Sequence, residues 1–265
     1  MQRGARSFGD HLRDWRRRRG LSQLGLAGDA QISARHLSFV ETGRARPSRD
    51  MVVRLAEQLQ VPLRERNVLL VAAGYAPMFP DRPIQDPALA VANEAMQRVL
   101  MAHLPFPAFA LDRYWNIVAS NSALPQLYQN VDASLLKRPV NALQLSLHPR
   151  GLSSSIENLE EWRAHLLHRL QREISLNPDP KLIDLRDELT SSGVGGRTAP
   201  DQSNSPLALL KIRVGTDLLT FFSTTMVFGT AGDLTLSELV MEFFFPANAE
   251  TSELAERLQA QLPVA

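Results

Sequence analysis

The stretch of chain from Ser22 to Ser48 limits the possible folds more than any other part of the sequence. Ser22 is a favourable N-cap for one short helix, and Ser33 is a favourable N-cap for a second. Gly43 is expected to end the second helix. Two helices of about two turns, joined by only a few residues, are typical of a helix-turn-helix and too compact for an ordinary helical hairpin.

The apolar pattern of the second helix assigns one of its faces to the interior. Leu37 and Val40 have helical spacing, so we expect both side chains to point inward. The outer face then offers four residues to the base edges of DNA: Ala34, Arg35, Ser38 and Phe39. An arginine in this place can bond O6 and N7 of a guanine together, whereas alanine and phenylalanine offer apolar contact, for instance to a thymine methyl group.

Charge is divided unequally along the chain. Residues 1–79 contain fourteen Arg, no Lys and seven acidic residues, which gives a net charge of +7. The remaining residues carry fifteen basic and twenty-one acidic side chains, a net charge of −6. Because concentrated positive charge attracts a polyanion, we expect the basic half, which also holds the helix-turn-helix pattern, to bind double-stranded DNA.

Three motifs in the first 79 residues match a known family. They read SQLGLA, SARHLSFVETGRARPS and VPLRERNVLLVAAGYAP. With them, residues 7–79 resemble the helix-turn-helix domain of the Xre family of bacterial repressors, in the MmyB-like branch. The resemblance implies base contacts by Ala34, Arg35, Ser38 and Phe39, and phosphate contacts by Gln23, Arg44 and Arg46. It also implies that Glu41 bonds within the domain, and that Gln31 stands where the family usually has glycine.

Two further helices and a linker are predicted after the motif. Ser48 caps a segment with apolar residues at helical spacing, and Pro62 opens another that ends at Gly74. The stretch from Tyr75 to Pro87 contains four prolines and no apolar periodicity, which predicts an irregular connection. We therefore predict a five-helix DNA-binding domain at 1–79, a Pro-rich linker at 80–87 and a second domain at 88–265.

The second domain is predicted to combine an antiparallel sheet with helices. Residues 88–103 have a helical pattern, and FPAFALD and YWNIVAS are predicted strands that Asp112-Arg113 joins in a tight turn. Next come helical patterns near 155–175 and 180–190, a polar loop at Ser191–Ser205, the β-rich runs LALLKIRV, LLTFFSTTMVFG and LTLSELVMEFFF, and a helix over Ala249–Leu262. This order is that of a PAS domain, and VLMAHLPFPAFALDRYWNIVASNSA resembles the start of the PAS-like, ligand-binding half of the MmyB-like family.

The apolar side chains of the second domain predict a pocket for a small apolar ligand. A sheet capped by helices can enclose a cavity, and a lining of Phe, Leu and Met suits an acyl chain better than a sugar or a nucleotide. We expect a fatty acid, or another elongated apolar molecule, with a carboxylate near Asn121 or Arg150. The candidate pocket residues are Phe106, Phe109, Trp115, Asn121, Leu143, Arg150, Phe222, Met226 and Phe243. Alternatively, its own side chains fill the domain, which then acts as a ligand-free dimerisation module.

Other classes of function find little support in the sequence. It has no Walker A, dinucleotide-binding or G-x-S-x-G pattern, and no carboxylate stands at a metal-ligand spacing from its six histidines. We therefore expect no catalysis, no metal and no cofactor. The chain has no cysteine, which excludes disulfides. Without an apolar signal region or a membrane-length apolar run, we expect a cytoplasmic protein with no membrane partner.

These features together predict a one-component transcription regulator that acts as a homodimer. The N-terminal domain would bind operator DNA, and the PAS-like domain would sense the ligand. The rival from a different class is a lipid-binding protein whose basic domain has no DNA function.

Overall fold

The computed structural model describes residues 6–128, 130–191 and 207–261, which form two compact units. The first unit comprises Met1–Pro83 together with Thr230–Ser237, and the second comprises Ile84–Gly229 and Glu238–Ala265. Apart from Ser191, the loop predicted at Ser191–Ser205 lies outside the described residues.

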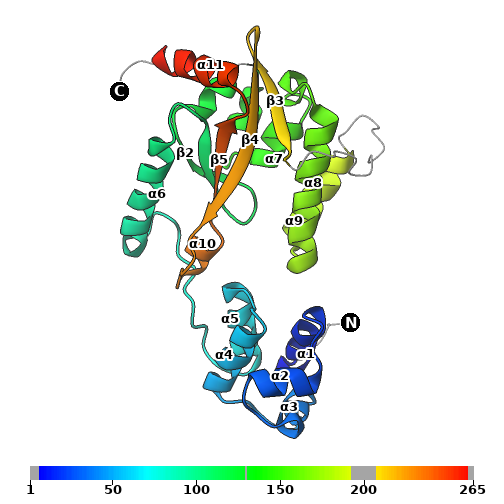
Figure 1. The fold of residues 1–265 in the computed structure, drawn as a ribbon. Helices are drawn as coiled ribbons and strands as arrows, with labels where there is room; N and C mark the ends of the chain where they lie inside the picture. Colours follow the sequence, from blue (N-terminus) through cyan, green and yellow to red (C-terminus); the bar gives the residue numbers. More distant parts are fainter. Residues whose placement is uncertain (1–5, 129, 192–206, 262–265) are drawn as a thin grey trace. The chain divides into compact units, whose positions relative to one another are not determined.

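The N-terminal part of the first unit is made of five helices, as the sequence predicts (Figure 1). They are α1 (Phe8–Arg18), α2 (Gln23–Asp29), α3 (Ala34–Glu41), α4 (Arg49–Gln58) and α5 (Leu63–Ala72). The predicted serine caps are confirmed, because Ser22, Ser33 and Ser48 accept the backbone N–H of the third residue that follows, at 3.0, 3.1 and 3.3 Å. Each bond satisfies an N–H group that the helix itself leaves without a partner.

The turn between α2 and α3 depends on one residue in an unusual backbone conformation. Gln31 has a φ of +54°, in the left-handed region that glycine adopts at little cost. The backbone N–H of Ile32 donates to the carbonyl of Ala27 at 2.9 Å and closes the end of α2. A glutamine therefore takes the conformation for which the Xre resemblance implies a glycine, and the turn is kept.

The first unit also takes in a segment from late in the chain. Thr230–Ser237, which includes the short helix α10 (Leu234–Ser237), connects β4 to β5. The backbone N–H of Leu234 donates to the carbonyl of Pro80 at 2.9 Å, and Arg82 Nη1 lies 2.9 Å from Asp233 Oδ2. Asp233 Oδ1 also accepts the N–H of Thr235 at 2.9 Å. This cap explains why the run LTLSELVMEFFF begins as a helix, so the prediction that all of it is β-rich is wrong.

The second unit is built on a five-stranded sheet in the order β2-β1-β5-β4-β3. The strands are β1 (Ala108–Leu111), β2 (Ile117–Ser120), β3 (Leu209–Val214), β4 (Asp217–Val227) and β5 (Val240–Pro246), and all neighbours are antiparallel. Helices cover the sheet, which confirms the predicted fold class of five helices followed by an antiparallel sheet with helices.

The connection between β1 and β2 is longer than predicted. The proposed two-residue turn at Asp112-Arg113 is wrong, because the strands are joined by five residues, Asp112–Asn116. The carboxylate of Asp112 accepts the backbone N–H groups of Tyr114 and Asn116 at 2.8 and 2.9 Å. Trp115 has a φ of +65° and is buried. The loop therefore delivers an indole ring to the core instead of only reversing the chain.

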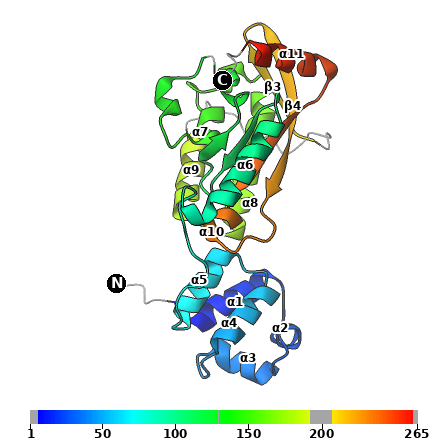
Figure 2. The ribbon, with the colours of Figure 1, turned by 90° about the vertical axis from the view of Figure 1, so that its left-hand side faces the viewer.

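The two faces of the sheet are covered by different helices (Figures 1 and 2). On one face α6 (Ala90–Ala102) packs Met96 and Leu100 against Ala108, Ala110 and other strand residues. The second face is covered by α7 (Ala142–Leu147), α8 (Leu159–Leu176) and α9 (Pro180–Ser191), while α11 (Ala249–Ala260) packs along β4. Successive strand residues point to opposite faces, so the register decides which side chains reach α8.

Candidate DNA-binding surface and apolar cavity

Helix α3 has one buried face and one accessible face, as its sequence predicts. Leu37 and Val40 are 0% and 1% exposed and belong to the core of the first unit. Arg35 is exposed, and Ser38 and Phe39 are partly exposed. Their accessible positions leave these three side chains available to an outside partner.

Ala34 and Phe39 differ in what they pack against. Ala34 is partly buried against the core of the first unit, so less of it is accessible than of Arg35. The guanidinium carbon of Arg35 lies 5.4 Å from the centre of the Phe39 ring. A cation over an aromatic face is attracted to it, so Phe39 restricts the directions that Arg35 takes.

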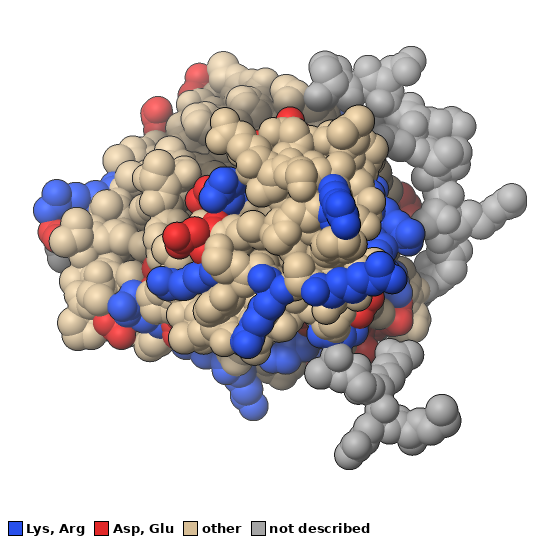
Figure 3. Space-filling view, turned by 90° about the horizontal axis from the view of Figure 1, so that it is seen from below, with Lys and Arg blue, Asp and Glu red and all other residues tan. Residues whose placement is uncertain are grey.

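Arginines are concentrated on the surface of the first unit, and Figure 3 shows Lys and Arg side chains across the face seen from below. The exposed arginines of α1 to α4 and their connections are Arg17, Arg18, Arg19, Arg35, Arg44, Arg46, Arg49 and Arg54. Arg46 donates to the carbonyl of Ala73 at 3.2 and 3.3 Å, which fixes its side chain. Together these arginines give the surface the positive charge that attracts a polyanion.

Glu41 is the centre of a buried polar network. Its carboxylate is 1% exposed and accepts Arg16 Nε at 2.6 Å, Arg16 Nη2 at 3.0 Å and Gln23 Nε2 at 2.8 Å. Burial alone would raise the pKa of Glu41, but the bonds from Arg16 and Gln23, with the charges of Arg16 and Arg13, lower it below its ordinary value. Gln23, predicted as a phosphate contact, here fixes the start of α2 to the end of α3.

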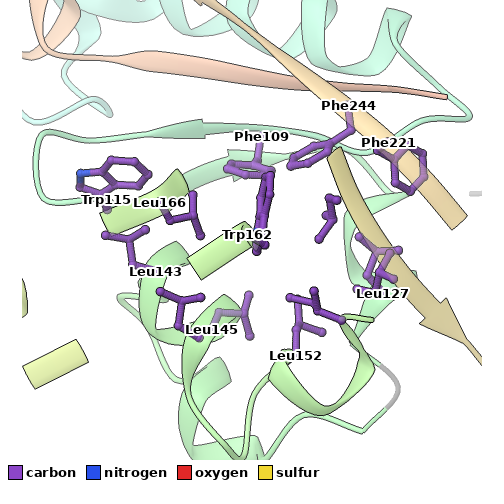
Figure 4. Close-up of a cluster of buried hydrophobic side chains, with 14 of the residues drawn as sticks. Phe109, Trp115, Leu127, Leu143, Leu145, Leu152, Trp162, Leu166, Phe221 and Phe244 are labelled. Carbon is purple, nitrogen blue, oxygen red and sulfur yellow. The ribbon is translucent and has the colours of Figure 1, made fainter. Parts of the chain in front are cut away.

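The second unit contains a partly open apolar cavity of about 70 Å³ between the sheet and the helices α7 and α8. Its walls include Phe109, Trp115, Leu143, Trp162 and Phe244. Figure 4 shows these side chains converging from the sheet and the helices on a common interior. Tyr128 also lines the cavity, and burial raises the pKa of its hydroxyl, which keeps it protonated.

The structure places three of the nine predicted pocket residues in this lining, namely Phe109, Trp115 and Leu143. Six predicted residues do not line it: Phe106, Asn121, Arg150, Phe222, Met226 and Phe243. Phe106 packs against the rim of the same core. The Asn121 amide bonds with the backbone of Ala108, Leu100 and Phe106 at 3.2, 3.1 and 2.8 Å, so it is committed to the fold. Arg150 is exposed and bonds Asp132 at 2.9 Å.

Strand register explains the other misplacements. In β5, Phe244 faces the cavity and Phe243 faces α6, because adjacent strand residues alternate. In β4, the cavity-side core takes Phe221, whereas the Phe222 ring stacks on Phe245 at a centroid distance of 5.5 Å. Met226 is 45% exposed. The period of two was visible in the sequence, but which of the two faces met α8 was not.

A charged cluster at the cavity wall was not predicted. Arg169 of α8 and Glu242 of β5 both line the cavity and form two parallel hydrogen bonds, of 2.9 and 2.8 Å. The guanidinium carbon of Arg169 lies 4.9 Å from the centre of the Trp115 ring, and Trp115 Nε1 donates to Glu173 at 2.8 Å. The lone carboxylate within the apolar run VMEFFF was the signal that could have revealed this cluster.

Metal sites and membrane-spanning helices were two further kinds of feature that the described residues could have contained. Over residues 6–128, 130–191 and 207–261, no three His, Cys, Asp or Glu gather in a way that would hold a metal ion. Within the same ranges, no helix combines the length and the apolar character needed to cross a membrane.

Comparison with known proteins agrees with these two units. The model of the MmyB-like transcription regulator ligand binding domain matches residues 92–258, and a helix-turn-helix domain model matches residues 7–69. No curated protein matches the chain. The first model describes a ligand-binding domain of a transcription regulator, which agrees with the prediction of a regulator rather than an enzyme. Since the first model covers more than half of the chain, the protein belongs to the family of the MmyB-like transcription regulators.

Proposed function

We propose that the protein is a one-component regulator that binds operator DNA through α3 and senses an apolar ligand in the cavity of its second unit. The main support is the outer face of α3, where Arg35, Ser38 and Phe39 are accessible while Leu37 and Val40 fix the helix to the core. In this proposal Arg44 and Arg46 contact phosphates, and the protein acts in the cytoplasm, where its DNA is.

The number of contacts favours a homodimer as the DNA-binding form. One short recognition helix offers few base contacts, so two copies on half-sites about one helical turn apart are needed for useful specificity. A ligand that binds one arrangement of the dimer more tightly than another shifts the population toward it and changes operator affinity. The change is limited by the difference between the ligand's two affinities.

DNA binding is tested with duplexes selected by the full chain from a random-sequence pool, with affinity measured by fluorescence anisotropy. We expect an enriched, two-fold symmetric site and an affinity that falls steeply with salt, with a slope set by the number of phosphates contacted. The lipid-binding rival without DNA function predicts no enriched sequence and a weak salt response, and that result would remove the regulator proposal.

The cavity supports a ligand of apolar character, such as a fatty acid or another elongated apolar molecule. Its volume of about 70 Å³ is well below the roughly 300–1,000 Å³ of typical ligand pockets. An acyl chain therefore has to displace lining side chains when it enters. Such displacement gives the bound and free forms different packing around β5, which is what a sensor requires.

The chain offers a route from the cavity to the first unit. Strand β5 carries Glu242 and Phe244 in the cavity wall, and it begins at Val240, separated by two residues from the segment Thr230–Ser237 of the first unit. In this proposal a ligand that shifts β5 also changes the geometry of the bonds that Asp233 and Leu234 make with the segment before Pro83.

The ligand part is tested by mass spectrometry of material extracted from the denatured, purified protein. We expect a co-purifying apolar molecule at a fixed ratio to the chain. A ligand-free dimerisation module predicts no such molecule and no effect of added apolar compounds on operator affinity.

A further inference from the structure

The charged cluster at the cavity wall restricts the head group of any ligand. Arg169 is the one cationic side chain among the described residues that line the cavity. Both of its terminal nitrogens are bonded to the two oxygens of Glu242, whose side chain is 5% exposed. Arg169 is itself only partly buried, and a guanidinium in a two-bond pair with a carboxylate has its charge compensated.

A second carboxylate lies next to this pair. Glu173 is one turn after Arg169 on α8 and accepts the indole N–H of Trp115, over whose ring Arg169 lies. The cluster therefore contains two carboxylates and one guanidinium, and it has no positive charge to spare. Burial raises the pKa of Glu173, although the bond from Trp115 opposes this, so a further negative charge would meet an already unfavourable site.

The same cluster can still bond an uncharged polar group. Each oxygen of Glu242 has acceptor capacity beyond its bond to Arg169, and the guanidinium has N–H groups beyond the two in that pair. A hydroxyl or a primary amide can donate to the carboxylate and accept from the guanidinium. A carboxylate can only accept, and it adds a charge that burial penalises.

We propose that the cavity selects an acyl-chain ligand with an uncharged head, a hydroxyl or an amide, over the matching fatty carboxylate, and that Glu242 sets this preference. The inference rests on the proposed role of the cavity as a ligand site and names the class of molecule within it. Glu242 acts here as a specificity-determining residue because its carboxylate compensates the positive charge of Arg169 that a carboxylate ligand would need.

The test compares octan-1-ol, octanamide and octanoate at neutral pH, with the full chain and with quenching of Trp115 and Trp162 as the readout. In the natural sequence we expect the alcohol and the amide to bind about tenfold or more tightly than octanoate. Glu242→Gln releases Arg169 and should improve octanoate binding by about tenfold while the alcohol changes little. Glu157→Gln, which removes an exposed carboxylate bonded to Arg213 outside the cavity, should change neither.

Glu242→Gln breaks the ion pair with Arg169 and can lower the stability of the fold. A second variant that keeps this pair is therefore included. Glu173→Gln keeps an acceptor for Trp115 and removes one negative charge, and octanoate should then bind several-fold more tightly. Octanoate binding as well as or better than the alcohol in the natural sequence would overturn the inference but leave the cavity a ligand site. Binding of none of the three compounds would remove the ligand site as well.

Discussion

Arg35 and Arg44 are both exposed arginines, but they are expected to serve DNA binding in different ways. Arg35 lies on the outer face of α3 with Phe39 beneath it, whereas Arg44 follows the helix. Replacing Arg35 by alanine should weaken binding to the selected duplex by about 1–3 kcal/mol and relax the preference at one base pair. Arg44→Ala should weaken all sequences alike and lower the salt slope by about one.

Anisotropy titrations against the selected duplex and against its single-base variants separate the two effects. Arg98→Ala, which removes an exposed arginine of α6 in the second unit, is the matched control and should leave the affinity unchanged. Equal weakening by Arg35→Ala on every sequence would make Arg35 a phosphate contact.

Glu41 should make the stability of the first unit depend on pH. Its pKa is lowered in the folded state, so it contributes stability above its unfolded pKa of about 4.3, and that contribution is lost as the pH falls through the folded value. Glu41→Gln leaves Arg16 buried without its charged partner and should cost on the order of 3 kcal/mol at neutral pH. The difference between the two proteins should shrink below about pH 4.

Hydrogen exchange of peptides from α1 and α3 in the full chain measures the stability of the first unit separately from that of the second. Glu157→Gln, in the second unit, controls for the loss of one acidic charge. A difference between Glu41→Gln and the natural chain that stays constant with pH would show that the network contributes no pH dependence.

At the scale of the elements, two turns contain a residue whose backbone conformation is expected to lower the stability of the first unit. Gln31 and Gln60 have φ values of +54° and +48°, in which a side chain is strained. Gln31→Gly or Gln60→Gly should therefore stabilise the first unit by up to about 1 kcal/mol. Gln58→Gly, two residues before Gln60 and at the last position of α4, should instead destabilise it by up to about 0.5–1 kcal/mol. Urea titrations followed by exchange of the α2 to α4 peptides compare the three variants.

The elements show what the sequence alone can predict. Helix starts were predictable, because Ser22, Ser33 and Ser48 carry the capping oxygens themselves. The loop that delivers Trp115 was not, because bonds to Asp112 and a left-handed residue hold it in place of a two-residue turn. The cavity was only partly predictable, since the face to which Phe243 and Phe244 point depends on packing against α6 and α8.

At the scale of the whole molecule, regulation requires that ligand binding in the second unit changes the free energy of DNA binding by the first unit. The first unit is completed by Thr230–Ser237, and Glu238 and Leu239 connect this segment to β5 of the cavity wall. The ion pair of Arg82 with Asp233, whose side chain is 6% exposed, holds the segment to the stretch before Pro83. This segment is therefore a structural element whose conformational equilibrium both ligand binding and DNA binding can influence.

Asp233→Asn should therefore reduce coupling and leave the two binding reactions largely intact. Removing one partner loosens the segment, so the ratio of operator affinities with and without octan-1-ol should move toward one, while the ligand affinity of the cavity stays the same. Glu57→Gln, which removes the ion pair of Glu57 with Arg66 in the same unit, is the control and should keep the full ratio. Anisotropy titrations at saturating and zero ligand give the ratio for each variant. An unchanged ratio in Asp233→Asn would mean that ligand and DNA are coupled by another route, such as the dimer itself.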